Sequence, residues 1–160
     1  MAKIKKLNSM RLLDAQSIRY EVHLYDKSIR DARQVADAVG VDADEVFKTL
    51  VAAAPAAKKP VLVMLPANTT LNLKRLAKAA GAKKMALAAH AEAETLTGLQ
   101  VGGISALALR QNKWTIYLDR RAEALDNIVI SAGQRGVQLR LETGALIAML
   151  GCKLVDVADA

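Results

Sequence analysis

The chain contains a single cysteine, Cys152, and this scarcity excludes a disulfide framework and a Cys-x-x-Cys zinc site. A reducing, cytoplasmic compartment is therefore the expected location. The basic N-terminus, residues 1–6, lacks the apolar run of a signal peptide, and no stretch approaches the length of a membrane span. The sequence predicts a soluble protein with no membrane partner.

Aromatic residues are also scarce, at 3% of the chain, so a surface on which nucleic-acid bases stack is poorly supplied. Basic residues are not scarce. The chain has 23 Lys and Arg against 16 Asp and Glu, which gives a formal net charge of +7. This balance favours an acidic partner such as nucleic acid, bound through its phosphate backbone.

The motifs of several large enzyme families are missing. The sequence has no GxxxxGK phosphate loop, no GxGxxG turn, no HExxH zinc motif and no GxSxG elbow. His23 and His90 lie far apart without an acidic or cysteine companion, and each is expected to be structural or exposed. Cys152 follows a glycine that ends a predicted helix, which is typical of a small buried hydrophobe. We predict no metal and no cofactor.

Strand-like and helix-like patterns alternate along the chain, which indicates one α/β domain over residues 1–160 with mixed strand directions. Two apolar runs, residues 49–54 and 61–65, flank a turn-like stretch at residues 55–60 and predict an antiparallel hairpin. Other predicted strands are residues 20–25, 114–118, 127–131 and 137–141; predicted helices begin at a cap on Asn8 or Ser9, near Ser28, and at residues 72, 92 and 143.

Lys48 interrupts the apolar run of residues 46–51, at the start of the predicted hairpin. Burial disfavours the ammonium form of lysine and leaves its donors in need of partners. A lysine in this position therefore either extends its charged end to water, which is the more frequent case, or serves a functional site.

Two further features are candidates for a site. Gly102 and Gly103 are adjacent in a loop, and such glycines allow backbone N–H groups to approach a carbonyl oxygen that becomes an oxyanion. A double glycine is more often only a turn. Ser131 ends a predicted strand, where a serine hydroxyl usually bonds the backbone.

Four segments, residues 47–50, 71–75, 96–105 and 129–136, together resemble the YbaK family, whose members are free-standing relatives of the editing domain in bacterial prolyl-tRNA synthetases. The resemblance spans nearly the whole chain in order. It implies a mixed, barrel-like β-sheet flanked by helices. It also implies hydrolysis of the ester bond in mischarged aminoacyl-tRNA: Cys-tRNA(Pro), or an alanyl, seryl or threonyl ester.

The resemblance also implies roles for particular residues. Lys48 takes the place of the family's essential lysine, and Gly103 that of the loop glycine near the substrate carbonyl. The substrate pocket is implied to include Tyr25, Thr49, Gly102, Ser105 and Ser131. The implied partners are aminoacyl-tRNA and, as a candidate, prolyl-tRNA synthetase.

The chain departs from the family after Ser105, where the family has proline and this chain has Ala106. Losing proline frees φ and restores a backbone N–H, so we expect a different pocket wall. The departure keeps a second hypothesis open, a tRNA- or synthetase-binding module without hydrolysis. A third is a hydrolase that acts on another small aminoacyl ester.

An aminoacyl ester is already reactive, so an editing enzyme needs only to position water or a substrate thiol and to stabilise the oxyanion. A catalytic triad is then unnecessary. A basic segment contains Lys74, Arg75 and Lys78, followed by Lys83 and Lys84. It would either contact tRNA phosphates or form a helix face exposed to solvent, and the sequence favours neither alternative.

Overall fold

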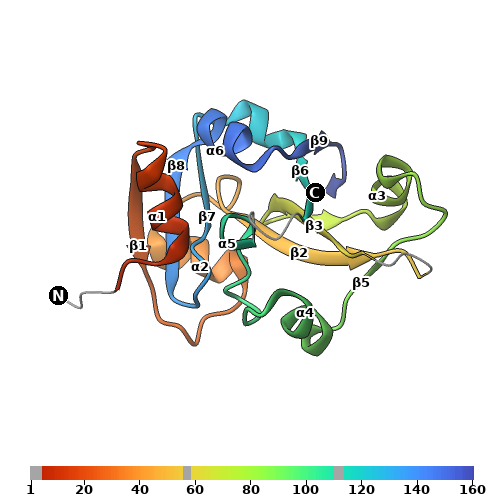
Figure 1. Cartoon of the computed structure of the whole chain (residues 1–160), viewed down its shortest axis with the longest axis horizontal. Coiled ribbons are helices and arrows are strands. Elements are labelled where there is room, and N and C mark those ends of the chain that lie inside the picture. Colours follow the sequence, from red (N-terminus) through yellow and green to blue (C-terminus); the bar gives the residue numbers. More distant parts are fainter. Residues whose placement is uncertain (1–4, 56–58, 110–113) are drawn as a thin grey trace.

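The computed structural model describes residues 5–55, 59–109 and 114–160, and the strands in these ranges form three sheets (Figure 1). The first sheet has the order β1 (Tyr20–Leu24), β8 (Val137–Glu142), β7 (Asn127–Ser131). The second has the order β5 (Ala86–Leu87), β2 (Phe47–Ala53), β3 (Val61–Pro66), β6 (Thr115–Asp119), β9 (Lys153–Val155). The third pairs β10 (Ala158–Asp159) with β4 (Thr70–Leu71).

The larger sheet has mixed strand directions, as predicted. β2 and β3 form the expected antiparallel hairpin, in a register that runs from Phe47 opposite Pro66 to Ala52 opposite Val61. Residues 56–58 of the predicted turn lie outside the described ranges. β3 then runs parallel to β6, and β6 runs parallel to β9. The strands remain divided among separate sheets, so the expected barrel-like arrangement is not a closed barrel.

Helices cover these sheets: α1 (Asn8–Ala15), α2 (Ala32–Val39), α3 (Leu73–Ala80), α4 (His90–Thr97), α5 (Ala106–Leu109), α6 (Thr143–Leu150) and the 3-10 helix η2 (Arg120–Ala124). Local signals set several ends. The Asp31 side chain caps α2, and Gly40 ends it in the left-handed conformation with φ 72°. Asn72 and Gly81 do the same for α3. None of the described helices is long and apolar enough to cross a membrane.

The first helix begins one or two residues earlier than expected. Its N-cap is Leu7, which makes no side-chain capping hydrogen bond, so the predicted cap on Asn8 or Ser9 is wrong. Both side chains have other partners. The Asn8 Oδ1 accepts from Arg11 at 2.9 Å, and the buried Ser9 hydroxyl donates to the carbonyl oxygen of Ala132 at 2.6 Å. Ser9 thus joins α1 to the end of β7.

The two larger sheets meet at a parallel β-bridge between Val46 and Val129. The backbone N–H of Val129 donates to the carbonyl oxygen of Glu45 at 2.9 Å. Beside this bridge, Phe47 and Ile130 are buried in the main apolar core. The two bridged segments run in the same direction. Lys48 and Ser131 therefore each lie two residues beyond the Val46–Val129 bridge, on the same side of it.

Candidate active site

A cavity of about 220 Å³ opens at this junction. Its walls come from β2, β7 and β8, from the starts of α2 and α4 and from the loop before α5. Apolar groups form much of the lining, with a few polar side chains among them, which is typical of a small-molecule site. Four predicted site residues line it: Lys48, Thr49, Gly102 and Ser131.

Lys48 is held inward by one short hydrogen bond. Its Nζ donates to the carbonyl oxygen of Thr69 at 2.6 Å, and the side chain is partly buried. Burial lowers the pKa of Lys48 below its ordinary value, while the negative charge of Asp31 opposes the shift and the positive charge of Arg33 adds to it. Lys48 is therefore anchored at the cavity, and its charge is only partly compensated.

Ser131 faces Gln138 across the pair β7–β8. The hydroxyl of Ser131 accepts a hydrogen bond from the N–H of Gly133 at 3.2 Å. Gln138 also lines the cavity and is 5% exposed. Its Nε2 donates to the hydroxyl of Tyr25 at 3.3 Å, and its Oε1 has no hydrogen-bond partner among the described residues. Tyr25 thus reaches the site through Gln138, whose amide oxygen is buried and unpaired among the described residues.

The two adjacent loop glycines have different structural roles. Gly102 lines the cavity with φ +90°, a conformation that favours glycine. Gly103 packs against the backbone of the β7–β8 connection: a Cβ there would lie 2.8 Å from the nitrogen of Arg135. The N–H of Gly103 donates to the carbonyl oxygen of Gln100 at 2.8 Å. Gly103 therefore permits close packing, and the N–H of Gly102 has no hydrogen-bond acceptor within the described ranges.

Two side chains hold this loop in place. The Arg135 Nε donates to the carbonyl oxygen of Val101 at 2.6 Å. The Glu94 Oε2 accepts from the N–H of Val101 at 2.8 Å and lies 3.8 Å from a guanidinium nitrogen of Arg135. Both backbone groups of Val101 are thus engaged, which fixes the residue next to Gly102.

Ser105 is 1% exposed, directly precedes α5 and is not among the residues that line the cavity. Its hydroxyl accepts from the N–H of Ala108 at 3.3 Å, in the manner of a helix cap. Ala106 is the first residue of this short helix. Proline is well tolerated at that position, because the first helical N–H has no intrahelical partner. Alanine and proline are thus both compatible with this position, and the expected difference in the pocket wall stays a prediction.

Comparison with known proteins identifies the family of the chain. Residues 26–149 match the model of the aminoacyl-tRNA editing domain, and this range contains every residue that lines the cavity. The chain belongs to this family. The chain is 31% identical to the Enterococcus faecalis protein EbsC, which carries the provisional name Cys-tRNA(Pro)/Cys-tRNA(Cys) deacylase. The alignment covers 98% of each chain.

The chain also resembles part of a longer enzyme. It is 33% identical over 106 residues to the proline–tRNA ligase of Streptococcus gordonii, a match that covers 66% of this chain and 17% of the ligase. Among solved structures, hypothetical protein APE2540 has a TM-score of 0.83 at 26% identity, covering 93% of this chain and 97% of that one. A protein described as a candidate trans-editing enzyme for prolyl-tRNA synthetase shares the fold, with a TM-score of 0.81 at 21% identity, over 99% of this chain and all of that one.

The predicted tRNA-binding residues Lys74, Arg75 and Lys78 lie on α3, away from the cavity. Their surroundings differ. The guanidinium of Arg75 is engaged by two carboxylates, Asp156 at 3.2 Å and Asp159 at 2.9 Å. These carboxylates compete with a phosphate for Arg75, so the expectation of phosphate binding rests on Lys74 and Lys78.

Sequence reasoning did not single out Gln138 or Arg135. Gln138 alternates with apolar residues along β8, a pattern typical of a strand with one solvent face, and nothing local shows that β8 is covered on both sides. The two histidines were expected to be structural or exposed; His90 is exposed and lines the cavity at the start of α4.

Cys152 is partly buried against the main core, and burial raises the pKa of its thiol, which suits a packing residue better than a nucleophile. Among the described residues, no group of three or more His, Cys, Asp or Glu side chains is placed to hold a metal ion.

Proposed function

We propose that the chain hydrolyses the ester bond between a small amino acid and tRNA, acting in trans on mischarged aminoacyl-tRNA. The observation that carries this proposal is the Lys48 ammonium, held by the Thr69 carbonyl at a small cavity lined by Ser131 and Gln138, in a member of the aminoacyl-tRNA editing family. The name of EbsC supports a cysteinyl ester as the first substrate to test, with alanyl, seryl and threonyl esters beside it.

Lys48 acts electrostatically in this proposal. Its ammonium group binds or orients the substrate carbonyl or the terminal adenosine, and its charge favours the developing oxyanion. The N–H of Gly102 has no acceptor of its own among the described residues, and we assign to it the donor role that the sequence assigned to the loop. Gly103 serves by letting the loop pack closely. Attack comes from water, or from the thiol of a cysteinyl substrate, and the tRNA 3′ hydroxyl leaves.

The cavity also contains groups suited to selecting the amino acid. Gln138, whose side-chain oxygen is buried without a partner in the described ranges, lines this space together with Thr49 and Ser131. A buried acceptor without a partner is costly, so a rotation of the Gln138 amide that brings this oxygen to a ligand donor is favoured. The α-ammonium group of every aminoacyl ester is such a donor. The limited cavity volume then restricts the side chain to a small one.

The partners follow from this activity. Aminoacyl-tRNA is the substrate, and similarity to a proline–tRNA ligase makes prolyl-tRNA synthetase the synthetase to test for association. Translation takes place in the cytoplasm, so the proposed reaction is placed there, in one domain that spans residues 1–160.

The test is deacylation of tRNA(Pro) charged with Cys, Ala, Ser or Thr, by wild-type protein and by Lys48→Ala. Lys59→Ala, which removes an exposed lysine, is the matched control. We expect one ester to be cleared quickly, the Lys48 variant to lose about 10²-fold in rate, and the control to match wild type. If wild type clears no ester faster than buffer but still binds tRNA in a salt-sensitive way, the chain is a binding module and the proposal falls.

A further inference from the structure

The C-terminal strand lies next to the residue that holds Lys48. β10 pairs with β4, with Ala158 opposite Leu71 and Asp159 opposite Thr70. The pairing continues at the next residue, where the N–H of Asn72 donates to the carbonyl oxygen of Val157 at 2.7 Å. β4 follows directly on Thr69, so the end of the chain supports the segment whose carbonyl binds Lys48.

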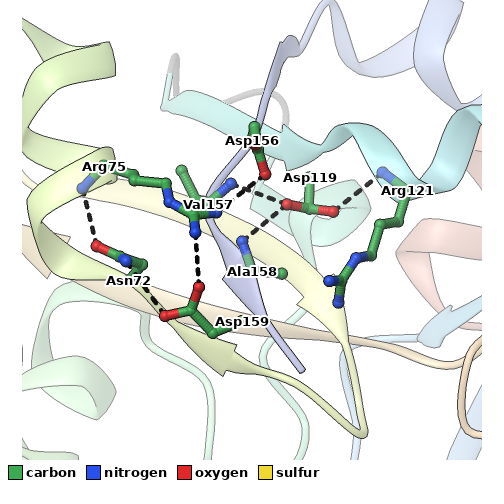
Figure 2. Close-up of polar contacts among 8 residues, drawn as sticks. All are labelled: Asn72, Arg75, Asp119, Arg121, Asp156, Val157, Ala158 and Asp159. Atoms are coloured by element: carbon green, nitrogen blue, oxygen red, sulfur yellow. Dashed lines mark hydrogen bonds and ion pairs between the residues drawn. The ribbon is translucent and has the colours of Figure 1, made fainter.

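Asp119 holds this strand from the larger sheet (Figure 2). The side chain is 1% exposed, and its Oδ2 accepts from the N–H groups of both Val157 and Ala158 at 2.9 Å. Its Oδ1 accepts from the N–H of Arg121 at 3.0 Å. A buried carboxylate is stable only when it is well bonded, and here three backbone donors supply those bonds.

A second contact closes over the strand from α3. Figure 2 shows the Arg75 guanidinium between the carboxylates of Asp156 and Asp159. The Asn72 side chain caps α3 through its Oδ1 and donates through its Nδ2 to Asp159 at 3.1 Å. The strand is therefore fastened to Asp119 on one side and to α3 on the other.

Thr69 itself is fixed from both ends. On its N-terminal side, its N–H and its hydroxyl both donate to the carbonyl oxygen of Pro66, at 3.1 and 2.7 Å. On its C-terminal side, β4 is paired with β10. Thr69 is 6% exposed, and its carbonyl oxygen accepts from the Lys48 ammonium.

We propose that Asp119 and the Arg75–Asp159 ion pair are positioning residues for Lys48. By holding β10 against β4, they fix the Thr69 carbonyl that holds the lysine ammonium at the cavity. This inference rests on the proposed function only in assigning Lys48 a catalytic role. Arg75 then acts through the C-terminal strand rather than through tRNA phosphates.

The first test is a double-mutant cycle of Arg75→Ala and Asp159→Ala, with Glu123→Ala as the matched control. Glu123 also forms an exposed ion pair with an arginine, Arg120, but makes no bond to β10. We expect each of the two single variants to lower kcat about tenfold with little change in KM, because Lys48 is misplaced. The kcat of the double variant should be no lower than that of either single variant. The Glu123 variant should match wild type.

Phosphate binding by Arg75 predicts a different pattern. Arg75→Ala would then raise KM and weaken its salt dependence, while Asp159→Ala, which removes a negative charge near the tRNA, would lower KM. That pattern overturns the proposal.

The second test follows Lys48 directly. The Lys48 Cε and its protons are observed by NMR in protein labelled at lysine Cε, and assigned by the signal that Lys48→Arg lacks. The Thr69 carbonyl stabilises the charged form, so its displacement should lower the pKa of Lys48 further. The other charged or titratable groups that face this lysine or line its cavity are Asp31, Arg33, Arg30 and His90.

Asp119→Asn is the second variant, because an amide cannot offer acceptors to all three N–H groups. In Asp119→Asn and Asp159→Ala we expect both a lower Lys48 pKa and faster amide exchange at Asn72. If amide exchange at Asn72 becomes faster but the Lys48 pKa does not change, the proposal is overturned. It is also overturned if neither the amide exchange nor the deacylation activity changes in any of these variants. This readout needs no substrate, so it separates failure of the positioning role from failure of the deacylase assignment.

Discussion

The surroundings of Lys48 disfavour its charged form. Its ammonium is partly removed from water, and one neutral carbonyl oxygen is its hydrogen-bond acceptor. Because burial lowers its pKa in the folded state, the unfolded chain binds more protons between the folded and the ordinary value. The free energy of unfolding therefore rises as pH increases through that interval, and the cost of burial is fully present below it.

Replacing this lysine with an apolar residue of similar length should separate stability from activity. In Lys48→Met we expect a thermal midpoint at or above that of wild type, and a loss of deacylation of about 10²-fold. The alkaline rise in stability should also be absent. Thermal melts at neutral and alkaline pH, with single-turnover deacylation, measure all three. A variant that melts lower but keeps its activity would contradict the assigned role.

For single residues, the sequence indicates a functional site where a polar or charged side chain interrupts an apolar run. Lys48 stands out because a charge interrupts an apolar run, and the structure places it at the cavity with Ser131. Gln138 does not stand out, since its surroundings depend on strands distant in the chain. Arg75 was predicted as part of a basic helix face, and its acidic partners lie 81 and 84 residues away. The roles of all four residues stay predictions until variants are measured.

Among the elements, the loop that ends at Ser105 depends on close contact with the β7–β8 connection. A methyl group on Gly103 would lie 2.8 Å from a backbone nitrogen that no side-chain rotation can move. The nearby residue Val101 is fastened by Glu94 and Arg135. The position of the cavity wall is thus set by packing of one loop on another.

We expect Gly103→Ala to lower the free energy of unfolding by about 1–3 kcal/mol, as overpacking commonly does, and to lower the deacylation rate. The Glu94 contact provides a graded comparison. Glu94→Gln keeps an acceptor for the Val101 N–H and should change the deacylation rate little. Glu94→Ala removes this acceptor and should lower the rate more. Urea unfolding and single-turnover rates measure these effects. Equal rates in all three variants would show that the loop position is unimportant.

Elements with strong local signals were predicted well. The β2–β3 hairpin follows from two apolar runs that flank a turn, and α3 follows from its apolar positions and the closing Gly81. β9, β10 and α5 were not predicted because each is only two to four residues long and offers no period to detect. β10 exists because Asp119 and β4 supply its hydrogen-bond partners. Such partners are visible only in three dimensions.

For the molecule as a whole, the net charge of +7 favours encounter with tRNA. We expect Lys74→Ala with Lys78→Ala to weaken tRNA binding and to reduce the slope of log affinity against log salt by roughly 0.7–0.9 for each phosphate that is no longer neutralised. Binding titrations at roughly 50 to 200 mM salt measure this slope. An unchanged slope would assign these lysines to a merely solvated face.

The walls of the cavity come from parts of the chain that are remote in sequence, from α2 and β2 through the loop before α5 to β8. Pairing of β1 with β8 joins residue 20 to residue 141, and β4 meets β10 across a similarly long stretch of sequence. Non-local pairing of this kind raises contact order and slows folding. The lining residues are spread from Arg30 to Gln138, so no short contiguous fragment contains the pocket. Catalytic activity therefore requires most of the topology to be complete, and partly folded chains are expected to show no deacylation.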